Sequence, residues 1–168
     1  QTETMKVNVL IAAVCLLYLK AAYGECGDGW LQRGHSCYHM SHDKQEWIHA
    51  ADICHMDGGY LIEVNDADEG HFLEHQVILF NVPEGQVWIG ATDNMIKGDW
   101  VWTHSNTYLS RGSYIHWAPG QPDDLGGSEN CLSIFSSTYF PGFWNDQNCN
   151  FQLHYICEKD ALQGSIIG

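Results

Sequence analysis

An oxygen-rich stretch, residues 121–131, reads QPDDLGGSENC and combines loop-forming residues with metal-ligand types. Its proline and paired glycines predict a loop. Calcium binds six to eight oxygen atoms from carboxylates, amides, backbone carbonyls and water. The stretch supplies five such side chains: Gln121, Asp123, Asp124, Glu129 and Asn130. We interpret it as a candidate calcium site, and the alternative is a solvated acidic loop.

A second oxygen-rich cluster, FWNDQNC, follows a short distance along the chain and contributes Asn145 and Asp146. Each cluster lies beside a cysteine, Cys131 in the first and Cys149 in the second. A disulfide between these two cysteines would bring both sets of oxygen ligands together. The alternative for this cluster is a turn stabilised by its Asn and Asp side chains.

A rival metal motif is HFLEH, in which His71 and His75 match the pattern H-x-x-E-H of one class of zinc hydrolases. On a helix these two histidines would share one face. No third ligand is defined, and no Ser–His–Asp or Cys–His arrangement stands out. We therefore expect two polar histidines on a helix, and no enzyme.

The charge balance limits the partners. The chain of 168 residues carries 7 basic and 21 acidic residues. This excess of acids argues against nucleic acid or an anionic membrane surface as a partner. Cations, neutral ligands and basic proteins remain.

The N-terminal segment resembles a targeting sequence. After Met5 and Lys6 come the apolar run VNVLIAAVCLLYL and small residues near Gly24, an order typical of a secretory signal. The run is short for a membrane span, and an uncleaved anchor is the alternative. We predict upstream residues and a signal over 1–24, one domain over 25–160 and a short tail over 161–168, in a protein secreted to the extracellular space with no membrane span in its mature form.

Cysteine usage fits that compartment. Of the seven cysteines, Cys15 lies in the targeting segment, which leaves six: Cys26, Cys37, Cys54, Cys131, Cys149 and Cys157. An even number in a secreted chain predicts three disulfides, and six cysteines allow 15 pairings. Cys26 and Cys37 are close enough in sequence to close an N-terminal hairpin. No cysteine is left over to form a disulfide between two chains, so a homo-oligomer would be non-covalent.

Two helices followed by short strands would position these residues. The first helix has Ser41 as candidate N-cap and Gly58 as candidate C-terminal glycine, with Trp47, Ala51 and Cys54 on one face. The second fits residues 65–80, where acids occupy the first turn and Phe72, Leu73, Gln76 and Leu79–Phe80 recur at helical spacing. Aromatic runs predict strands at VWIGA, WVWTH, YIHWA, CLSIF and HYICE. The prediction is one α+β domain.

Over about residues 26–159 the chain resembles a C-type lectin-like domain. The resemblance rests on these pieces in this order: CGDGWLQRGHSCY, a cysteine in the first helix, VWIGATD, QPD followed by ENC, WND before Cys149, and HYICE. It implies two helices flanking antiparallel sheets, with a long loop that holds calcium. It also implies disulfides from Cys26 to Cys37, from Cys54 to Cys157 and from Cys131 to Cys149.

The resemblance also implies a ligand set for one principal Ca2+ ion. Its members are Gln121, Asp123, Glu129, Asn145 and Asp146, with a cis peptide bond before Pro122. In the family, two neighbouring sugar hydroxyls complete the ion's coordination, so the same five residues would bind carbohydrate. The QPD form usually accompanies galactose-type ligands. Galactose-selective relatives often place an aromatic ring where this chain has Leu125, and Tyr139, Phe140 and Phe143 are candidate replacements.

An auxiliary calcium site of the family is matched less well. Its positions correspond to Asp93, Lys97, Asp124, Glu129 and Asn130. Lys97 stands where an acid is expected, and Asn130 replaces another carboxylate. We expect this site to be lost or weak. The resulting hypothesis is a secreted, calcium-dependent lectin for galactose or N-acetylgalactosamine, acting in innate recognition of microbial surface polysaccharide. The alternative is a lectin-like protein of a matrix or mineral surface that binds no sugar.

Overall fold

The computed structural model describes residues 26–80, 82, 85–109, 113–137 and 139–162, together with Asn8. The predicted targeting segment, apart from Asn8, is outside the described residues. The chain divides into two compact units, one of residues Gln1–Tyr38 and Lys159–Gly168, the other of residues His39–Glu158. In the part of the chain that is described, no helix is both long enough and apolar enough to cross a bilayer.

The smaller unit contains an N-terminal hairpin. Strand β1 (Leu31–Arg33) pairs antiparallel with the start of β2 (Ser36–Met40). The disulfide between Cys26 and Cys37 closes the hairpin. The Lys159 ammonium lies 3.8 Å from the centre of the Trp30 ring, a cation–π contact.

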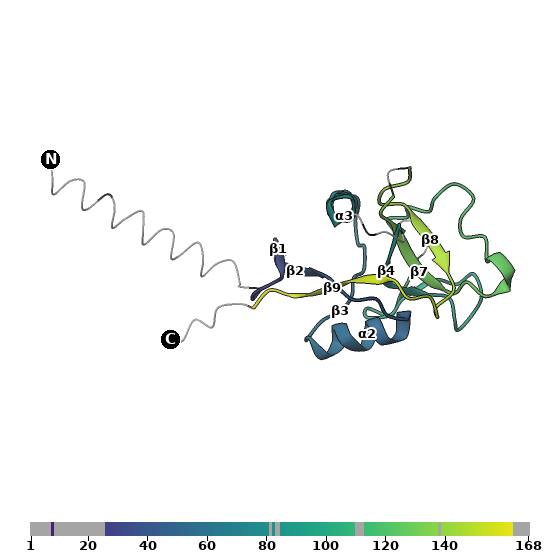
Figure 1. Ribbon diagram of the computed structural model, residues 1–168, viewed down its shortest axis with the longest axis horizontal. Coiled ribbons are helices and arrows are strands. Elements are labelled where there is room, and N and C mark those ends of the chain that lie inside the picture. The colour runs from purple at the N-terminus through teal and green to yellow at the C-terminus, as the bar shows by residue number, and fades with distance from the viewer. Residues whose placement is uncertain are drawn as a thin grey trace. The chain divides into compact units, whose positions relative to one another are not determined.

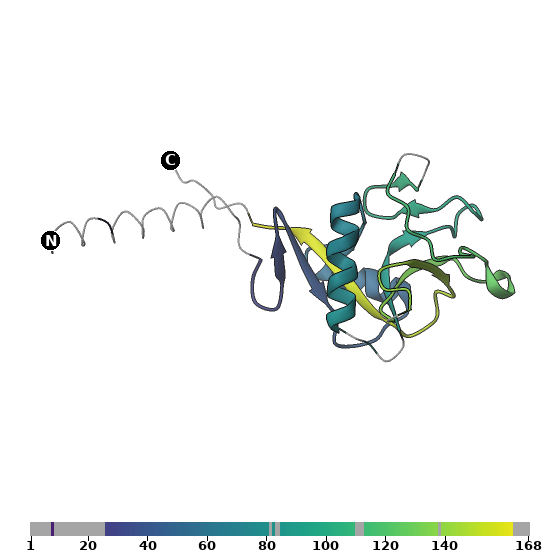
Figure 2. The ribbon, with the colours of Figure 1, turned by 90° about the horizontal axis from the view of Figure 1, so that it is seen from above.

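The larger unit contains both helices. Helix α2 (Trp47–Met56) and helix α3 (Ala67–Phe80) lie on opposite sides of strands β4 (Gln86–Thr92) and β9 (His154–Asp160), as Figures 1 and 2 show. The Trp47 indole donates a hydrogen bond of 2.9 Å to the Ile89 carbonyl, which fixes α2 against β4. This arrangement is the predicted one of two helices flanking the sheet.

The start of α2 corrects the sequence prediction. Ser41 is not its N-cap, because the helix begins at Trp47. The Ser41 hydroxyl instead donates to the Asp43 carbonyl and accepts from the Tyr155 amide. At the other end Gly58 has φ of 79°, and the amides of Gly58 and Gly59 donate to the last turn of the helix. This is a Schellman ending, and the predicted C-terminal glycine is confirmed.

The buried faces of the two helices agree with the prediction in part: Trp47, Cys54 and Leu73 are buried as predicted. Ala50 rather than Ala51 is fully buried beside Trp47 and Cys54. On α3 the buried apolar residues are Leu73 and Val77, whereas Leu79 is 67% exposed. The tertiary contacts therefore select a narrower face than the periodicity suggests.

The remaining strands form a mostly antiparallel sheet around β4. They are β3 (Tyr60–Leu61), β5 (Val101–Trp102), β6 (Thr107–Tyr108), β7 (Cys131–Phe135) and β8 (Trp144–Gln147). Strand β4 pairs antiparallel with β5 and β7, and parallel with β9. Strand β7 also pairs antiparallel with β8. The fold class, α+β with two helices and three disulfides, is confirmed.

Two strand predictions failed for opposite reasons. The run YIHWA forms no regular strand, and of its residues Trp117 makes an isolated bridge to Trp144. The segment WND, for which the sequence predicted ligand residues and no strand, is part of strand β8 (Trp144–Gln147). Aromatic content indicates burial in both segments, but hydrogen-bonding partners determine which one becomes a strand.

A close backbone contact explains one glycine of the sheet. The Gly90 amide donates to the Ile62 carbonyl at 2.8 Å. A Cβ atom at this position would collide with the Leu61 carbonyl oxygen. Glycine is therefore required where β4 passes the segment after β3.

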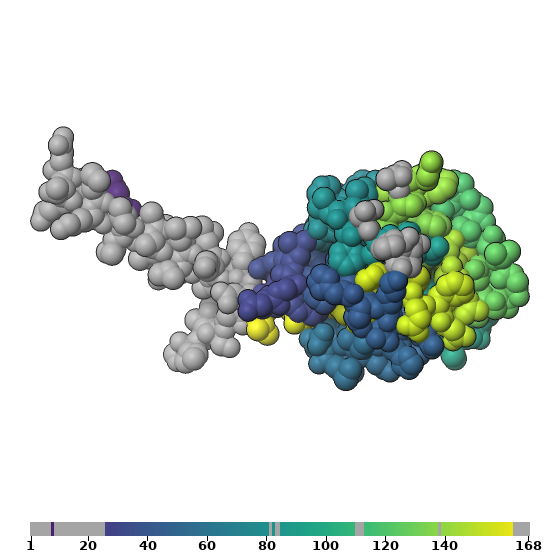
Figure 3. Space-filling view, viewed as in Figure 1, coloured from purple at the N-terminus to yellow at the C-terminus, as the bar shows by residue number. Residues whose placement is uncertain are grey.

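A cluster of indole rings forms part of the core of the larger unit. Trp144, 1% exposed, makes edge contacts with Trp102 at 5.7 Å and Trp117 at 5.9 Å between ring centres. The short helix η1 (Leu125–Gly127) lies in the long loop, at the outer edge of the larger unit in Figure 1. In Figure 3 the same loop, in green, forms the exposed edge of that unit. Because Trp144 begins β8, this cluster anchors the strand that carries Asn145 and Asp146.

Candidate metal centre

Three carboxylates from separate parts of the chain converge in the larger unit. Oxygen atoms of Asp123, Glu129 and Asp146 all lie within 4.8 Å of one another. Asp123 is exposed, whereas Glu129 is 8% exposed and Asp146 is fully buried. The geometry brings together the acids of both sequence clusters.

Strand register and a disulfide bring the two clusters together. Strand β8 pairs with β7 so that Asp146 lies opposite Leu132 and Asn145 opposite Ser133. Glu129 is two residues before the start of β7, so it lies near the same end of the pair. The disulfide between Cys131 and Cys149 joins the strand ends with a Cα separation of 5.2 Å. These pairs, with Cys54 joined to Cys157 on β9, are the ones that the resemblance implies.

The loop backbone wraps around the acids. Both carboxylate oxygens of Asp146 accept backbone N–H groups, from Asp123 at 3.2 Å and from Asp124 at 2.8 Å. The Glu129 carboxylate accepts the N–H of Leu125 at 2.9 Å. The loop therefore holds two of the three carboxylates in fixed orientations.

The electrostatics of the cluster favour a bound cation. Burial is the main cause that raises the pKa of Glu129. The hydrogen bond from the Leu125 amide lowers this pKa, the charges of Asp146 and Asp123 raise it, and the net shift is upward. Two like charges 4 Å apart repel by roughly 4 kcal/mol at an effective dielectric constant of about 20. Three carboxylates held this closely are stabilised by a cation among them.

An unpartnered buried oxygen in the same loop is a candidate for a further ligand. The side-chain oxygen Oε1 of Gln121 is buried and has no hydrogen-bond partner, although buried acceptors are nearly always paired. Gln121 precedes the peptide bond to Pro122, which is cis. An uncharged oxygen and three carboxylates suit calcium, which prefers hard oxygen ligands. The residues present therefore fit a calcium ion.

Asn145 is held by residues that the sequence analysis did not identify. Its amide donates to Gln86 Oε1 at 3.3 Å and also contacts the Asp146 carbonyl oxygen. The Ser133 hydroxyl makes hydrogen bonds to the same Gln86 oxygen and to the Asn145 carbonyl. Gln86 is 59 positions from Asn145 in sequence, and no local pattern indicates that they meet.

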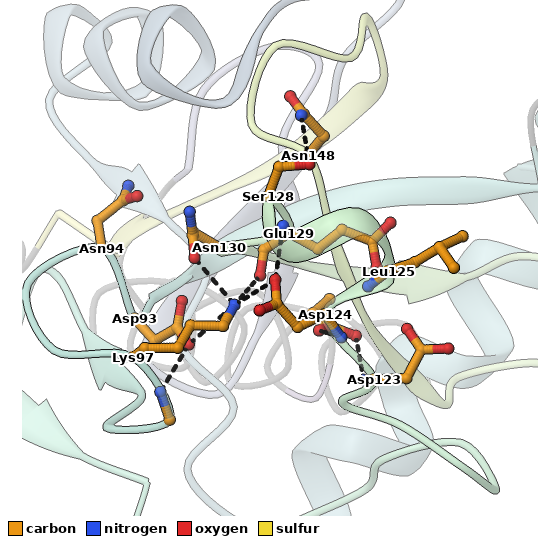
Figure 4. A network of polar contacts seen from close by, with 12 residues as sticks. Asp93, Asn94, Lys97, Asp123, Asp124, Leu125, Ser128, Glu129, Asn130 and Asn148 are labelled. Atoms are coloured by element: carbon orange, nitrogen blue, oxygen red, sulfur yellow. Dashed lines mark hydrogen bonds and ion pairs between the residues drawn. The ribbon is translucent and has the colours of Figure 1, made fainter.

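A second polar network, drawn in Figure 4, lies next to the three carboxylates and is centred on Lys97. The Lys97 ammonium is 2.7 Å from an Asp124 carboxylate oxygen and 3.4 Å from one of Asp93. The hydrogen bond from Lys97 lowers the pKa of Asp124. Burial lowers the pKa of Lys97, but its bond to Asp124 and the nearby charges outweigh burial, so that pKa is raised. Both groups are charged at neutral pH.

The candidate replacement rings pack in the β7–β8 hairpin. Phe143 stacks on His116 with 4.1 Å between ring centres. Phe140 contacts Phe135 and Phe143, and Tyr139 is 87% exposed in the turn between the strands. Leu125, the second residue after the QPD motif, is 72% exposed, so an aliphatic side chain stands where galactose-selective relatives often have an aromatic ring.

The HFLEH motif does lie on a helix, since α3 contains both His71 and His75. Across the described residues, the acidic group around Asp146 is the one set of three potential metal ligands. No third ligand group joins these histidines there. The zinc alternative therefore has no support from the geometry.

Comparison with known proteins gives the class that this fold and site define. The Lectin C-type domain model matches residues 43–159. The chain belongs to the C-type lectin family. Because the domains of this family are carbohydrate-binding modules and not enzymes, the prediction that the chain is not an enzyme is confirmed.

Particular relatives cover most of the chain. Perlucin of Haliotis laevigata is 33% identical over 139 residues, which are 82% of this chain and 84% of perlucin. The galactose-specific lectin nattectin of Thalassophryne nattereri is 28% identical over 159 residues, 91% of this chain and 95% of nattectin. Among solved structures, the carbohydrate-recognition domain of cow CD23 in the presence of an oligosaccharide matches with a TM-score of 0.71 at 28% identity, covering 83% of this chain and 98% of that domain.

Other relatives are longer proteins. Human asialoglycoprotein receptor 2 is 33% identical over 80% of this chain, but the chain spans only 40% of that receptor's length.

Proposed function

We propose that this chain is a calcium-dependent carbohydrate-binding domain with a preference for galactose-type sugars. One observation carries the proposal: three carboxylates, two of them buried, converge in one place. In the same loop, Gln121 has a buried side-chain oxygen without a hydrogen-bond partner. Such a group of oxygens is costly to bury without a cation, and it matches the ligand types that calcium prefers. Membership in a family of lectins supplies the link from the ion to sugar.

The candidate ligands contribute two kinds of group to binding. Asp123, Glu129 and Asp146 provide charge for the ion, while Gln121 and Asn145 provide neutral amide groups. The calcium ion, when bound, supplies a charge to which two sugar hydroxyl oxygens can coordinate. Around that hydroxyl pair, carboxylates accept and amides donate hydrogen bonds. The order of amide and carboxylate in the loop therefore determines which hydroxyl geometry fits.

Two features support a galactose-type ligand of moderate selectivity. The loop reads QPD, with the amide first and the carboxylate third, and the relative nattectin is named as galactose-specific. Leu125 offers an aliphatic surface, 72% exposed, to the apolar face of a sugar, but no aromatic ring. We expect the preference over mannose to rest mainly on hydrogen-bond geometry.

We further propose that the domain acts outside the cell. Three disulfides, at Cys26–Cys37, Cys54–Cys157 and Cys131–Cys149, favour an oxidising compartment. Galactose-bearing glycans, including microbial surface polysaccharides, are the proposed partners. A glycan array probed with and without calcium tests the proposal. Calcium-dependent signals on galactose or N-acetylgalactosamine support it, and an array without calcium-dependent signals contradicts it.

The proposal predicts one functional calcium ion per chain. The acids around Asp146 form one site, and the ammonium of Lys97 lies among the oxygens that a second ion would need. Titration calorimetry of chelator-treated protein should give a stoichiometry of one, with a rise in thermal midpoint on calcium addition. Two tight ions per chain would contradict this count.

Calcium affinity should fall in mild acid. The pKa of Glu129 is raised in the ion-free site, so a proton competes for this ligand at a higher pH than for an ordinary glutamate. Above that pKa the affinity should be constant, and below it the affinity should drop by up to about tenfold per pH unit for each proton displaced.

The stability of the ion-free fold should depend on pH in the opposite direction to the calcium affinity. A raised carboxyl pKa contributes stability that is present at low pH and is lost as pH rises through that pKa. Calcium titrations at several pH values would check the predicted fall in calcium affinity, with Glu129→Gln as the control. The variant should bind calcium more weakly and with less pH dependence, whereas an unchanged pH profile would contradict the role of Glu129.

A further inference from the structure

The ammonium of Lys97 is surrounded by oxygen atoms of the long loop and its neighbour. Besides the Asp124 and Asp93 carboxylates, it donates to the Glu129 carbonyl at 2.6 Å and to Asn130 Oδ1 at 2.9 Å. Figure 4 shows this side chain reaching from the loop between β4 and β5 to all four groups. One cation thus joins both ends of the segment from residue 124 to residue 130.

These oxygens are the positions at which the family resemblance implies an auxiliary calcium. The residues present do not fit that ion, because a positive charge already contacts them. The Asp93 side chain is 1% exposed, and the same oxygen that contacts Lys97, Oδ2, also accepts the Gly98 amide at 2.8 Å. A divalent ion here would lie against an ammonium, which costs far more than it gains. The disagreement between family pattern and structure centres on Lys97.

The lysine network is directly connected to the three carboxylates. Asp124 accepts Lys97 through its side chain, while its backbone N–H donates to Asp146 at 2.8 Å. Glu129 accepts Lys97 through its carbonyl, while its carboxylate belongs to the candidate calcium site. Asp124 Oδ1 also accepts the Glu129 amide at 3.1 Å. Two residues therefore link the ammonium to the calcium ligands.

The backbone at Asp124 needs such support. Its φ and ψ are both 48°, in the left-handed region, which a non-glycine residue adopts at an energetic cost and keeps only when its surroundings hold it. The Asp124 carboxylate lies 2.7 Å from the Lys97 ammonium. Loss of the ammonium would leave Asp93 and Asp124 facing each other without the charge between them.

We propose that Lys97 is a positioning residue: its ammonium takes the place of a second metal ion and holds the loop over residues 121–130 ready for calcium. The inference rests on the proposed calcium site, but it makes a separate claim about the calcium-free protein. The loop is ordered before the ion binds, because its cation is covalently part of the chain. Binding of a single calcium ion then needs no prior ion.

The direct test replaces Lys97 with methionine, which keeps the length of the side chain and removes the charge. In calcium-free protein, amide hydrogen exchange over residues 121–130 should accelerate by at least about tenfold, while exchange in β4 and β7 stays as in the parent. Calcium affinity should fall by roughly 10- to 100-fold, as expected when a residue that orients metal ligands is lost. Lys44→Met, at an exposed lysine on a different segment, is the matched control and should change neither value.

A second variant, Lys97→Glu, tests the replacement idea. It restores the acid of the family pattern, so a second calcium should bind, and calorimetry should give two ions per chain instead of one. Loop exchange should be fast without calcium and should return to the parent value when both ions are bound. This readout separates the proposal from mere destabilisation, which added calcium at a second site would not correct.

The outcomes are distinguishable. Parent-like loop exchange and calcium affinity in Lys97→Met would overturn the inference, as would a Lys97→Glu protein that binds a single ion. If the parent protein binds no calcium, the proposed function fails. The exchange of the calcium-free loop would then still decide whether Lys97 orders it.

Discussion

Asp146→Ala is expected to abolish calcium and sugar binding while leaving the fold in place. The Asp146 side chain is fully buried, supplies one of the three converging carboxylates and accepts the amides of Asp123 and Asp124. Its loss removes a charged ligand and frees the loop at once. Calcium affinity should fall by more than about 100-fold, because loss of even a residue that only supports a ligand costs roughly 10- to 100-fold.

The fold should survive this change because its main supports are elsewhere. The disulfide between Cys131 and Cys149 and the indole contacts of Trp144 do not involve the Asp146 carboxylate. Calcium titration, sugar binding and circular dichroism would be measured on the variant and on Asp52→Ala, an exposed acid of α2. Sugar binding that persists in Asp146→Ala with calcium present would contradict the assigned site.

The double variant Gln121→Glu with Asp123→Asn is expected to shift sugar preference from galactose toward mannose. The exchange keeps the number of carboxylates, so calcium affinity should change little. It reverses which side of the paired hydroxyls meets an acceptor and which meets an amide donor. One good hydrogen bond that is lost in a shielded site is worth about 1–3 kcal/mol, so the ratio of affinities should change by about tenfold or more.

Competition for an immobilised ligand by free galactose and free mannose would measure this shift. A lower concentration of galactose than of mannose should release the parent from the immobilised ligand. The double variant should show the reverse order. The single variant Gln121→Glu is the control for charge, since it adds one carboxylate without exchanging the pair. Mannose competing better than galactose on the parent would refute the selectivity, whereas the calcium site would be unaffected by that result.

Much of the fold could be predicted because local signals and long-range pairing agree. Gly58 ends α2 in a Schellman motif, and the apolar runs of β4, β7 and β9 pair as strands. The wrong predictions come from local sequence patterns whose hydrogen-bond partners lie far away in the sequence. The sequence predicts Ser41 as an N-cap, but its hydroxyl accepts a hydrogen bond from the Tyr155 amide, 114 positions away in sequence.

How much could be predicted from the sequence differs between the residues of the candidate site. Asp123, Glu129 and Asp146 have the right chemistry and flank cysteines, so their convergence follows once the clusters meet. Gln86 holds Asn145 through the registers of β4, β7 and β8, and no short motif encodes that contact. Lys97 could be recognised as an exception to the family pattern, but its four oxygen contacts emerge only from the folded loop.

Retention on a galactose resin is the most direct test of the central claim, that the loop around Asp146 holds calcium to bind sugar. The parent protein would be applied with calcium and then eluted with a chelator, beside Asp146→Ala under identical conditions. The account predicts that the parent is retained with calcium and released by chelator, and that the variant passes through. A parent that ignores both calcium and galactose would contradict it and would favour a lectin-like domain for a matrix or protein surface.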